Sequence, residues 1–219
     1  MSLVRRSIGA CLVVVLMAAT ARAQTDDTRY EIAAGVRFVG PESLGRVDAN
    51  ETNPGGGDFR LFTADSTLHA LVGLDARLGV RVTRAIRVEA TGSYGASDLD
   101  VKLDADVEGA AGITASERVR QFTVEGAAIV EISRWRLGDH ATPFVSAGAG
   151  YLRALHEDRV LVDEGALWHA GGGINLVLRP SQSRPLGVRL DARAVFQRGI
   201  IDDDVHAAPV FGASAFLRF

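Results

Sequence analysis

The chain has 219 residues, with 24 basic and 27 acidic side chains, a net charge of −3 and a single cysteine, Cys11. This length fits one domain, and the mildly acidic balance gives no support to nucleic-acid binding. A lone cysteine excludes an internal disulfide, and the isolated histidines show no metal-ligand spacing. We therefore expect no cofactor and no metal site.

Residues 1–23 have the three parts of a secretory signal peptide. Arg5 and Arg6 precede an apolar run over residues 8–19, and residues 21–23 read Ala-Arg-Ala, a small-residue cleavage site. The apolar run is shorter than the roughly 20 residues that a membrane-spanning helix needs. We predict a leader cleaved after Ala23 and one mature domain over residues 24–219, which has no cysteine and a net charge of −6.

Eight later segments alternate between apolar residues and polar residues or glycine. Successive side chains of a strand point to opposite faces, so this period of two predicts strands with one apolar face. The segments cover residues 30–38, 68–80, 86–94, 121–132, 145–151, 168–178, 186–197 and 211–219.

The connections between these segments alternate in length. Short ones lie at residues 83–85, 133–142 and 179–185, and long ones lie at residues 40–67, 97–120, 154–165 and 199–208. Transmembrane β-barrels have short periplasmic turns and long extracellular loops. The pattern predicts an all-β fold, an eight-stranded antiparallel up-and-down transmembrane β-barrel with both ends of the chain in the periplasm.

The last strand ends on Phe219, and other strands are rich in glycine, as in the run Ser-Ala-Gly-Ala-Gly-Tyr over residues 146–151. Both features resemble the small outer-membrane β-barrels of the OmpA and OmpX type, over the whole mature chain. The resemblance implies that Phe219 is part of an insertion signal read by the barrel-insertion machinery. It also implies a location in the bacterial outer membrane, in contact with lipids that include lipopolysaccharide.

Seven aromatic residues of the apolar face each lie beside a long connection. Aromatic rings gather at the two interfaces of a membrane, so these residues predict an aromatic girdle at the outer interface. Tyr30 and Phe219 mark the opposite rim, about 20 Å away for strands tilted by roughly 40°. Two such belts favour a membrane barrel over a soluble, lipocalin-like one. The seven residues are Phe38, Tyr94, Phe122, Tyr151, Trp168, Phe196 and Phe211.

The opposite face of the strands carries charges of both signs in near balance. The interior of an eight-stranded barrel is just wide enough to be filled by side chains, so we predict an ion-paired plug in which arginines bridge carboxylates. The predicted network consists of Glu31, Arg37, Asp75, Arg77, Arg87, Glu89, Glu125, Glu131, Arg189, Asp191, Arg193 and Arg218.

The favoured function is a structural or surface-interaction role without catalysis, with a surface ligand that the sequence does not identify. A narrow passive channel for small molecules or ions is one alternative, because many inward positions are glycine. A lipid A-modifying enzyme is the other. His69, His169 and His206 are candidates for it by residue type only, and neither His69 nor His169 has the His-x-Ser spacing of the outer-membrane deacylases.

Two of the long connections have features of their own. Residues 98–107 keep the alternation and then reach a Gly-Ala-Ala-Gly turn, which predicts a hairpin that projects above the membrane. Its exposed edge would be open to an added strand from a partner. The acidic run at residues 202–204 lacks the spacing of a calcium loop, and we interpret it as solvated loop charge.

Overall fold

The computed structural model describes residues 28–52, 55–104, 112–138, 140–156, 162–178, 184–198 and 205–219. The predicted signal peptide and the acidic run at residues 202–204 lie outside these ranges, as does the part of the predicted hairpin beyond residue 104. Within the described residues, no helix is long and apolar enough to cross a membrane.

The described chain is almost entirely strand. It forms ten strands and one short 3-10 helix, which lies in the turn between β6 and β7. In chain order these are β1 (Tyr30–Val39), β2 (Glu42–Thr52), β3 (Asp58–Leu68), β4 (Leu71–Arg81), β5 (Ile86–Asp104), β6 (Ile113–Glu131), η1 (Ser133–Trp135), β7 (Ala141–His156), β8 (Val162–Val177), β9 (Leu186–Arg198) and β10 (Val205–Arg218).

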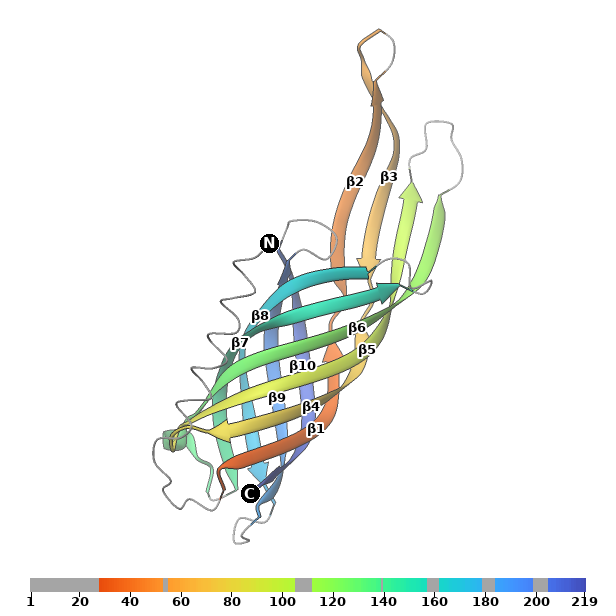
Figure 1. Cartoon of the computed structure of the whole chain (residues 1–219). Helices are drawn as coiled ribbons and strands as arrows, with labels where there is room; N and C mark the ends of the chain where they lie inside the picture. The colour runs from red at the N-terminus through yellow and green to blue at the C-terminus, as the bar shows by residue number, and fades with distance from the viewer. Residues whose placement is uncertain are drawn as a thin grey trace, which may run out of the picture.

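Eight of these strands close into the predicted antiparallel barrel. β1 pairs with β4 on one side and with β10 on the other, so the first and last strands seal the sheet. The ring continues through β4, β5, β6, β7, β8 and β9 to β10, and every pairing is antiparallel. Figure 1 shows these strands tilted around a common axis. The all-β, eight-stranded prediction is confirmed.

The first long connection is folded rather than irregular. β2 and β3 form a hairpin within it, and β3 pairs with the upper part of β5, from Thr63 opposite Asp104 to Leu68 opposite Leu99. Leu68, which the alternation assigned to the second barrel strand, is the last residue of β3. Together, β2, β3 and the upper parts of β5 and β6 make a four-stranded sheet that rises from one side of the barrel, here called the projecting sheet (Figure 1).

The upper hairpin of β5 and β6 is present, with Leu103 opposite Ile113. The hairpin has two edges, and the sequence did not indicate which of them a partner strand would use. The β6 edge pairs with β7 only from Val119 onward, so an added strand along residues 113–118 stays a prediction. The β5 edge is not open, because the preceding connection supplies β3, which occupies it over residues 99–104. A structured neighbour satisfies the edge hydrogen bonds that would otherwise attract another chain.

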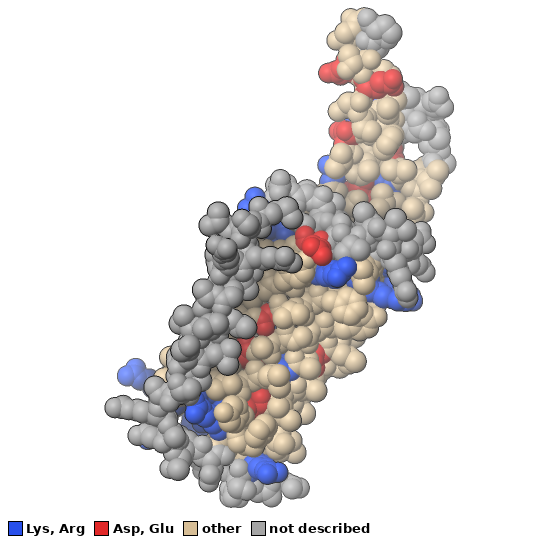
Figure 2. Space-filling view, viewed as in Figure 1, with Lys and Arg blue, Asp and Glu red and all other residues tan. Residues whose placement is uncertain are grey.

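The barrel has an apolar outside and a polar inside. Large apolar side chains such as Leu74 and Leu78 are 63% and 64% exposed on the outer face, whereas charged side chains are buried within. In Figure 2 the visible wall of the barrel is mostly uncharged, and basic side chains gather towards its two ends. A surface of this kind suits a hydrocarbon band and not water.

Candidate functional site

The described part of the barrel lumen contains two clusters of charges, and the first lies near the start of β1 and the end of β10. At its centre, the carboxylate of Glu31 on β1 accepts a hydrogen bond of 2.9 Å from Arg87 Nη1 on β5 and one of 2.7 Å from Arg218 Nε on β10. Arg87 and Arg218 also reach Glu131 on β6, at 3.1 and 2.9 Å. Four strands are therefore tied together across the interior.

Arg189 on β9 is the most deeply buried member of this cluster, with no exposed surface. It donates hydrogen bonds to Asn175 Oδ1 at 3.0 Å and to Glu89 Oε2 at 2.6 Å, and it also contacts Glu31. Its guanidinium carbon lies 5.5 Å from the centre of the Phe144 ring. A cation over an aromatic face is stabilised electrostatically, which adds to the effect of the paired carboxylates.

Phe216 breaks the alternation of residues 211–219, because it is a large apolar residue that points inward. It is 1% exposed, and Arg218 lies over its ring, 4.8 Å from the centre. The two inward aromatic residues, Phe144 and Phe216, therefore share this end of the lumen with the ion pairs.

A second cluster lies closer to the long loops, around Glu125 on β6. Its carboxylate is 3.4 Å from Arg37 Nη1 on β1, 3.2 Å from Arg193 Nη1 on β9 and 3.3 Å from His169 Nε2 on β8. Arg37 also donates a hydrogen bond to Thr123 Oγ1 at 3.1 Å. His169 points into the lumen and is 4% exposed.

Arg77 on β4 connects the two clusters. It pairs with Asp75 at 2.5 Å and with Asp191 on β9 at 3.0 Å, and its other contact, at 3.9 Å, is with Glu89 of the first cluster. Asp191 in turn lies 3.2 Å from Arg193 Nε in the second cluster. All twelve charged residues named from the sequence point into the lumen and take part in ion pairs, and their six carboxylates match six guanidinium groups.

Inward glycines make room for these large side chains. A methyl group added at Gly79 would lie 2.9 Å from Arg87 Cδ, and one at Gly212 would lie 2.8 Å from the carboxylate of Asp191. Since real Cβ atoms essentially never approach other atoms so closely, a side chain at either position would force Arg87 or Asp191 to shift within its ion pairs.

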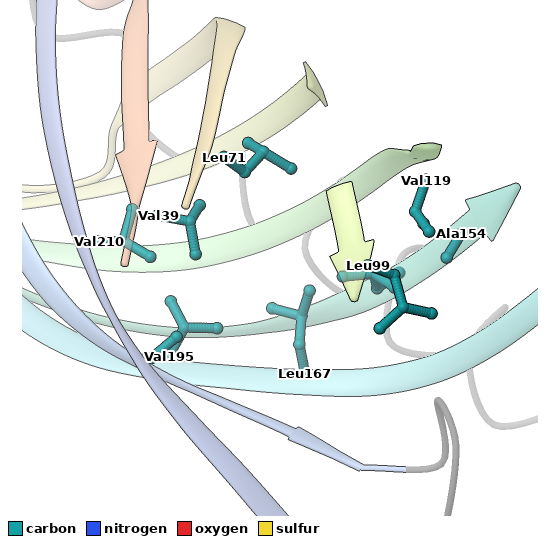
Figure 3. Packing of buried hydrophobic residues seen from close by; sticks show 10 residues of the cluster. Val39, Leu71, Leu99, Val119, Ala154, Leu167, Val195 and Val210 are labelled. Atoms are coloured by element: carbon teal, nitrogen blue, oxygen red, sulfur yellow. The ribbon is translucent and has the colours of Figure 1, made fainter. Parts of the chain in front are cut away.

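An apolar layer, which the sequence analysis missed, lies above the charges at the loop end of the lumen. Its ten buried residues come from all eight barrel strands, and Figure 3 shows eight of them labelled, projecting from the surrounding strands. The signal in the sequence is that inward positions near the long loops change from charged to aliphatic. The layer consists of Val39, Leu71, Leu99, Val119, Leu152, Ala154, Leu167, Val195, Ala208 and Val210.

The projecting sheet is attached at this layer. Leu68 of β3 and Val101 of β5 pack against it. At the start of β2, Glu42 is buried and accepts a hydrogen bond of 3.2 Å from Gln197 Nε2 on β9. Burial raises the pKa of the Glu42 carboxyl, and His206, 4.0 Å away on β10, opposes this shift.

The seven predicted girdle residues lie on the outer face, six of them exposed and Phe196 partly buried. Three pairs of rings from neighbouring strands are in contact, with centres 4.8 to 6.5 Å apart: Phe38 with Phe211, Tyr94 with Phe122, and Trp168 with Phe196. At the opposite rim, the rings of Tyr30 and Phe219 stack with centres 6.0 Å apart.

His69 lies beside a carboxylate, as a catalytic histidine often does, but the nearby hydroxyl bonds to that carboxylate and not to the histidine. Its Nε2 lies 2.7 Å from Asp100 Oδ2, and the Ser116 hydroxyl donates to the same carboxylate. Both hydrogen bonds lower the pKa of Asp100, and the bond from Ser116 has the larger effect. An activated nucleophile needs its hydroxyl next to the base. Here the carboxylate stands between the two, so the trio does not form a nucleophile–base pair.

Comparisons with known proteins inform the fold. No family model matches the chain, and no curated protein matches it. Among solved structures, Neisserial surface protein A has a TM-score of 0.52 at 11% identity, over 87% of this chain and 97% of its own. OprG from Pseudomonas aeruginosa has a TM-score of 0.51 at 11% identity, over 88% of this chain and 96% of its own. The chain therefore has the fold of the small β-barrel proteins of the bacterial outer membrane, as its resemblance to the OmpA and OmpX type implied.

Proposed function

We propose that this protein is an integral outer-membrane barrel with a closed lumen, which holds the projecting sheet at the cell surface for a structural or surface-interaction role. The observation that carries the proposal is the apolar layer. Every barrel strand contributes to it, and it covers the ion-paired clusters from the loop side.

The closed lumen follows from two successive barriers. An ion entering from the loop side would first lose its water among aliphatic side chains, because a hydrophobic constriction excludes water. Below that layer, each guanidinium that might attract an anion is already paired with a carboxylate, as Arg77 is with Asp75 and Asp191. The inward glycines do not argue for a channel, since side chains occupy the space beside them, as Arg87 does at Gly79.

Conductance of the purified protein in planar lipid bilayers tests the closed lumen. The unmodified protein is expected to pass no sustained current. The variant Leu71→Ser/Leu167→Ser places polar groups in the apolar layer on two strands that lie opposite each other. We expect this variant to pass a current. Leu74→Ser/Leu190→Ser, on the lipid face, is the matched control. A steady ohmic current from the unmodified protein would overturn the proposal.

The surface position of the projecting sheet is tested by labelling single cysteines in intact cells with a membrane-impermeant maleimide. Asp58→Cys lies at the start of β3, far from the barrel, and Arg84→Cys lies in the short turn between β4 and β5. We expect labelling at position 58 and none at position 84 until the cells are broken. The reverse pattern would show the opposite orientation.

A role in lipid A modification is not part of this proposal, because the Ser116 hydroxyl is bonded to Asp100 instead of to His69. Lipid A from cells with and without the protein is expected to give the same mass spectrum. A new or missing acyl chain that depends on the protein would contradict a non-catalytic role.

A further inference from the structure

Four arginines lie on the outer surface of the barrel just beyond the aromatic girdle. Arg118 and Arg120 are on β6, Arg153 is on β7 and Arg198 is on β9, and all four are exposed. We refer to them as the arginine row. Basic side chains are visible at this upper end of the barrel wall in Figure 2.

The strand register places the row at a definite level. Arg120, Arg153 and Arg198 each lie two positions from a girdle aromatic on the same strand, so they share its outward face. Two residues of strand span about 6.6 Å, or about 5 Å along the membrane normal for strands tilted by roughly 40°. Because the girdle marks the edge of the hydrocarbon, the guanidinium groups lie at the level of lipid headgroups.

Neighbouring members of the row are close enough to hold one ligand together. Arg153 lies opposite Phe122, and Arg120 lies opposite Leu155, so the two arginines are diagonal neighbours on paired strands. Such neighbours have Cα atoms about 7–8 Å apart, within reach of long side chains. Arg198 lies opposite Ala166 on β8, and Glu164 is the next residue of β8 on the same outward face.

The ion pairs that the described residues form with these arginines are exposed and weak. Arg153 lies 3.9 Å from Glu164, and Arg118 lies 3.4 Å from Asp98, and in both pairs each side chain is more than half exposed. Such surface pairs contribute little stability and are readily exchanged. The Tyr151 hydroxyl also hydrogen-bonds Glu164, which satisfies part of that carboxylate. Among the described residues, two carboxylates thus pair with members of this group of four guanidinium groups.

Among the described residues of the barrel wall, the row lies on one part of the rim. On β10, β1 and β4, the residues two positions loopward of the girdle level are Pro209, Gly40 and Ala70. A general need for solubility would distribute charge around the whole barrel. A local group of arginines indicates a local anionic ligand.

From this placement we infer that the arginine row binds the phosphate groups of an outer-leaflet lipid, of the phosphorylated glucosamine type found in lipopolysaccharide. Guanidinium groups match phosphate oxygens with paired hydrogen bonds, which gives arginine an advantage over a point charge. The acyl chains of such a lipid would lie along the apolar wall below, against residues such as Val124, which is 66% exposed. Its phosphates would then meet Arg120 and Arg153 without leaving the membrane.

Native mass spectrometry of the folded protein, released from zwitterionic detergent micelles, tests the inference. Diphosphoryl lipid A is titrated against the unmodified protein and against Arg120→Gln/Arg153→Gln. A basic side chain near an anionic membrane surface contributes about fivefold in affinity, so we expect the double variant to bind about 25-fold more weakly. Lipid A stripped of both phosphates is expected to bind the unmodified protein as weakly as diphosphoryl lipid A binds the variant.

The control variant is Arg46→Gln/Arg60→Gln, which removes two exposed arginines from the projecting sheet, and it is expected to bind like the unmodified protein. Inorganic phosphate at the same concentration is expected neither to bind nor to compete. Equal binding by the row variant, equal loss in the control, or displacement by inorganic phosphate would each overturn the assignment. These outcomes are independent of conductance, so a leaky lumen would leave this inference standing.

Discussion

The ion pair between Arg189 and Glu89 joins two strands that lie opposite each other in the barrel. Arg189 Nη1 on β9 is 2.6 Å from Glu89 Oε2 on β5, and three strands separate β9 from β5 in either direction around the ring. Both side chains are almost completely buried. The pair therefore spans the lumen. It fills part of the interior and restrains the barrel against flattening.

Removing one member of this pair should destabilise the barrel strongly. Arg189→Ala or Glu89→Ala takes the nearest partner from a buried charge, and breaking a buried pair typically costs about 3–5 kcal/mol. The double variant removes both charges and should cost less than the sum of the two single changes. Urea-dependent loss of the compact, heat-modifiable form in lipid vesicles measures all three.

Arg118→Ala is the control for that series, because its pair with Asp98 is exposed and should contribute less than about 1 kcal/mol. Strict additivity of Arg189→Ala and Glu89→Ala would show that the two residues do not interact in the membrane.

The apolar layer should behave as a packed core. Leu152 is 2% exposed, so Leu152→Ala removes buried contacts and is expected to cost about 2–5 kcal/mol. Leu74 is 63% exposed on the outer face, where lipid chains can fill the space that Leu74→Ala leaves, and a much smaller loss is expected. The same unfolding assay compares the two variants. Similar losses at both positions would contradict a packed layer inside the lumen.

The barrel strands were predictable because a membrane strand has a different environment on each face. Lipid requires apolar side chains on the outer face, so the charged side chains of a segment such as residues 71–81 must point into the lumen. The alternation with a period of two is therefore strong. The inward orientation of all twelve charged residues follows from the same constraint.

Other parts of the fold lack that regular signal. The hairpin of β2 and β3 carries register shifts between Ser43 and Gly45 and between Ala49 and Asn50, which interrupt the alternation. In the apolar layer both faces are apolar, as at Leu71 beside Val72, so the period of two disappears. The pairing of Arg189 with Glu89 depends on the stagger of all eight strands, which no single segment specifies.

A charge placed on the outer face should cost more at mid-height than near the girdle. Ala76 lies halfway along β4, opposite Ala34 of β1, whereas Val72 lies opposite the girdle residue Phe38. Arginine at the midplane of a membrane barrel costs about 2–4 kcal/mol, falling to about 0–1 near the interface. Ala76→Arg should therefore destabilise the barrel in vesicles clearly more than Val72→Arg. Equal costs would place the hydrocarbon band elsewhere.

Glu42 should make the stability of the barrel mouth depend on pH. Because burial raises the pKa of this carboxyl in the folded state, the folded protein holds the proton to a higher pH than the unfolded chain does. Its contribution to stability is thus fully present below the ordinary glutamate pKa, about 4.3, and is lost as pH rises through the raised value. His206 on β10 faces the carboxylate and limits the loss for as long as it stays protonated.

Glu42→Gln keeps an oxygen that accepts the hydrogen bond from Gln197 and removes the ionisation. We expect its urea midpoint to exceed that of the unmodified protein at neutral pH, with the difference shrinking towards pH 4. Glu51→Gln, at an exposed position of the same strand, is the matched control and should follow the unmodified protein across the range. Parallel curves for Glu42→Gln and the unmodified protein would show that this carboxyl is not buried over the apolar layer in the folded barrel.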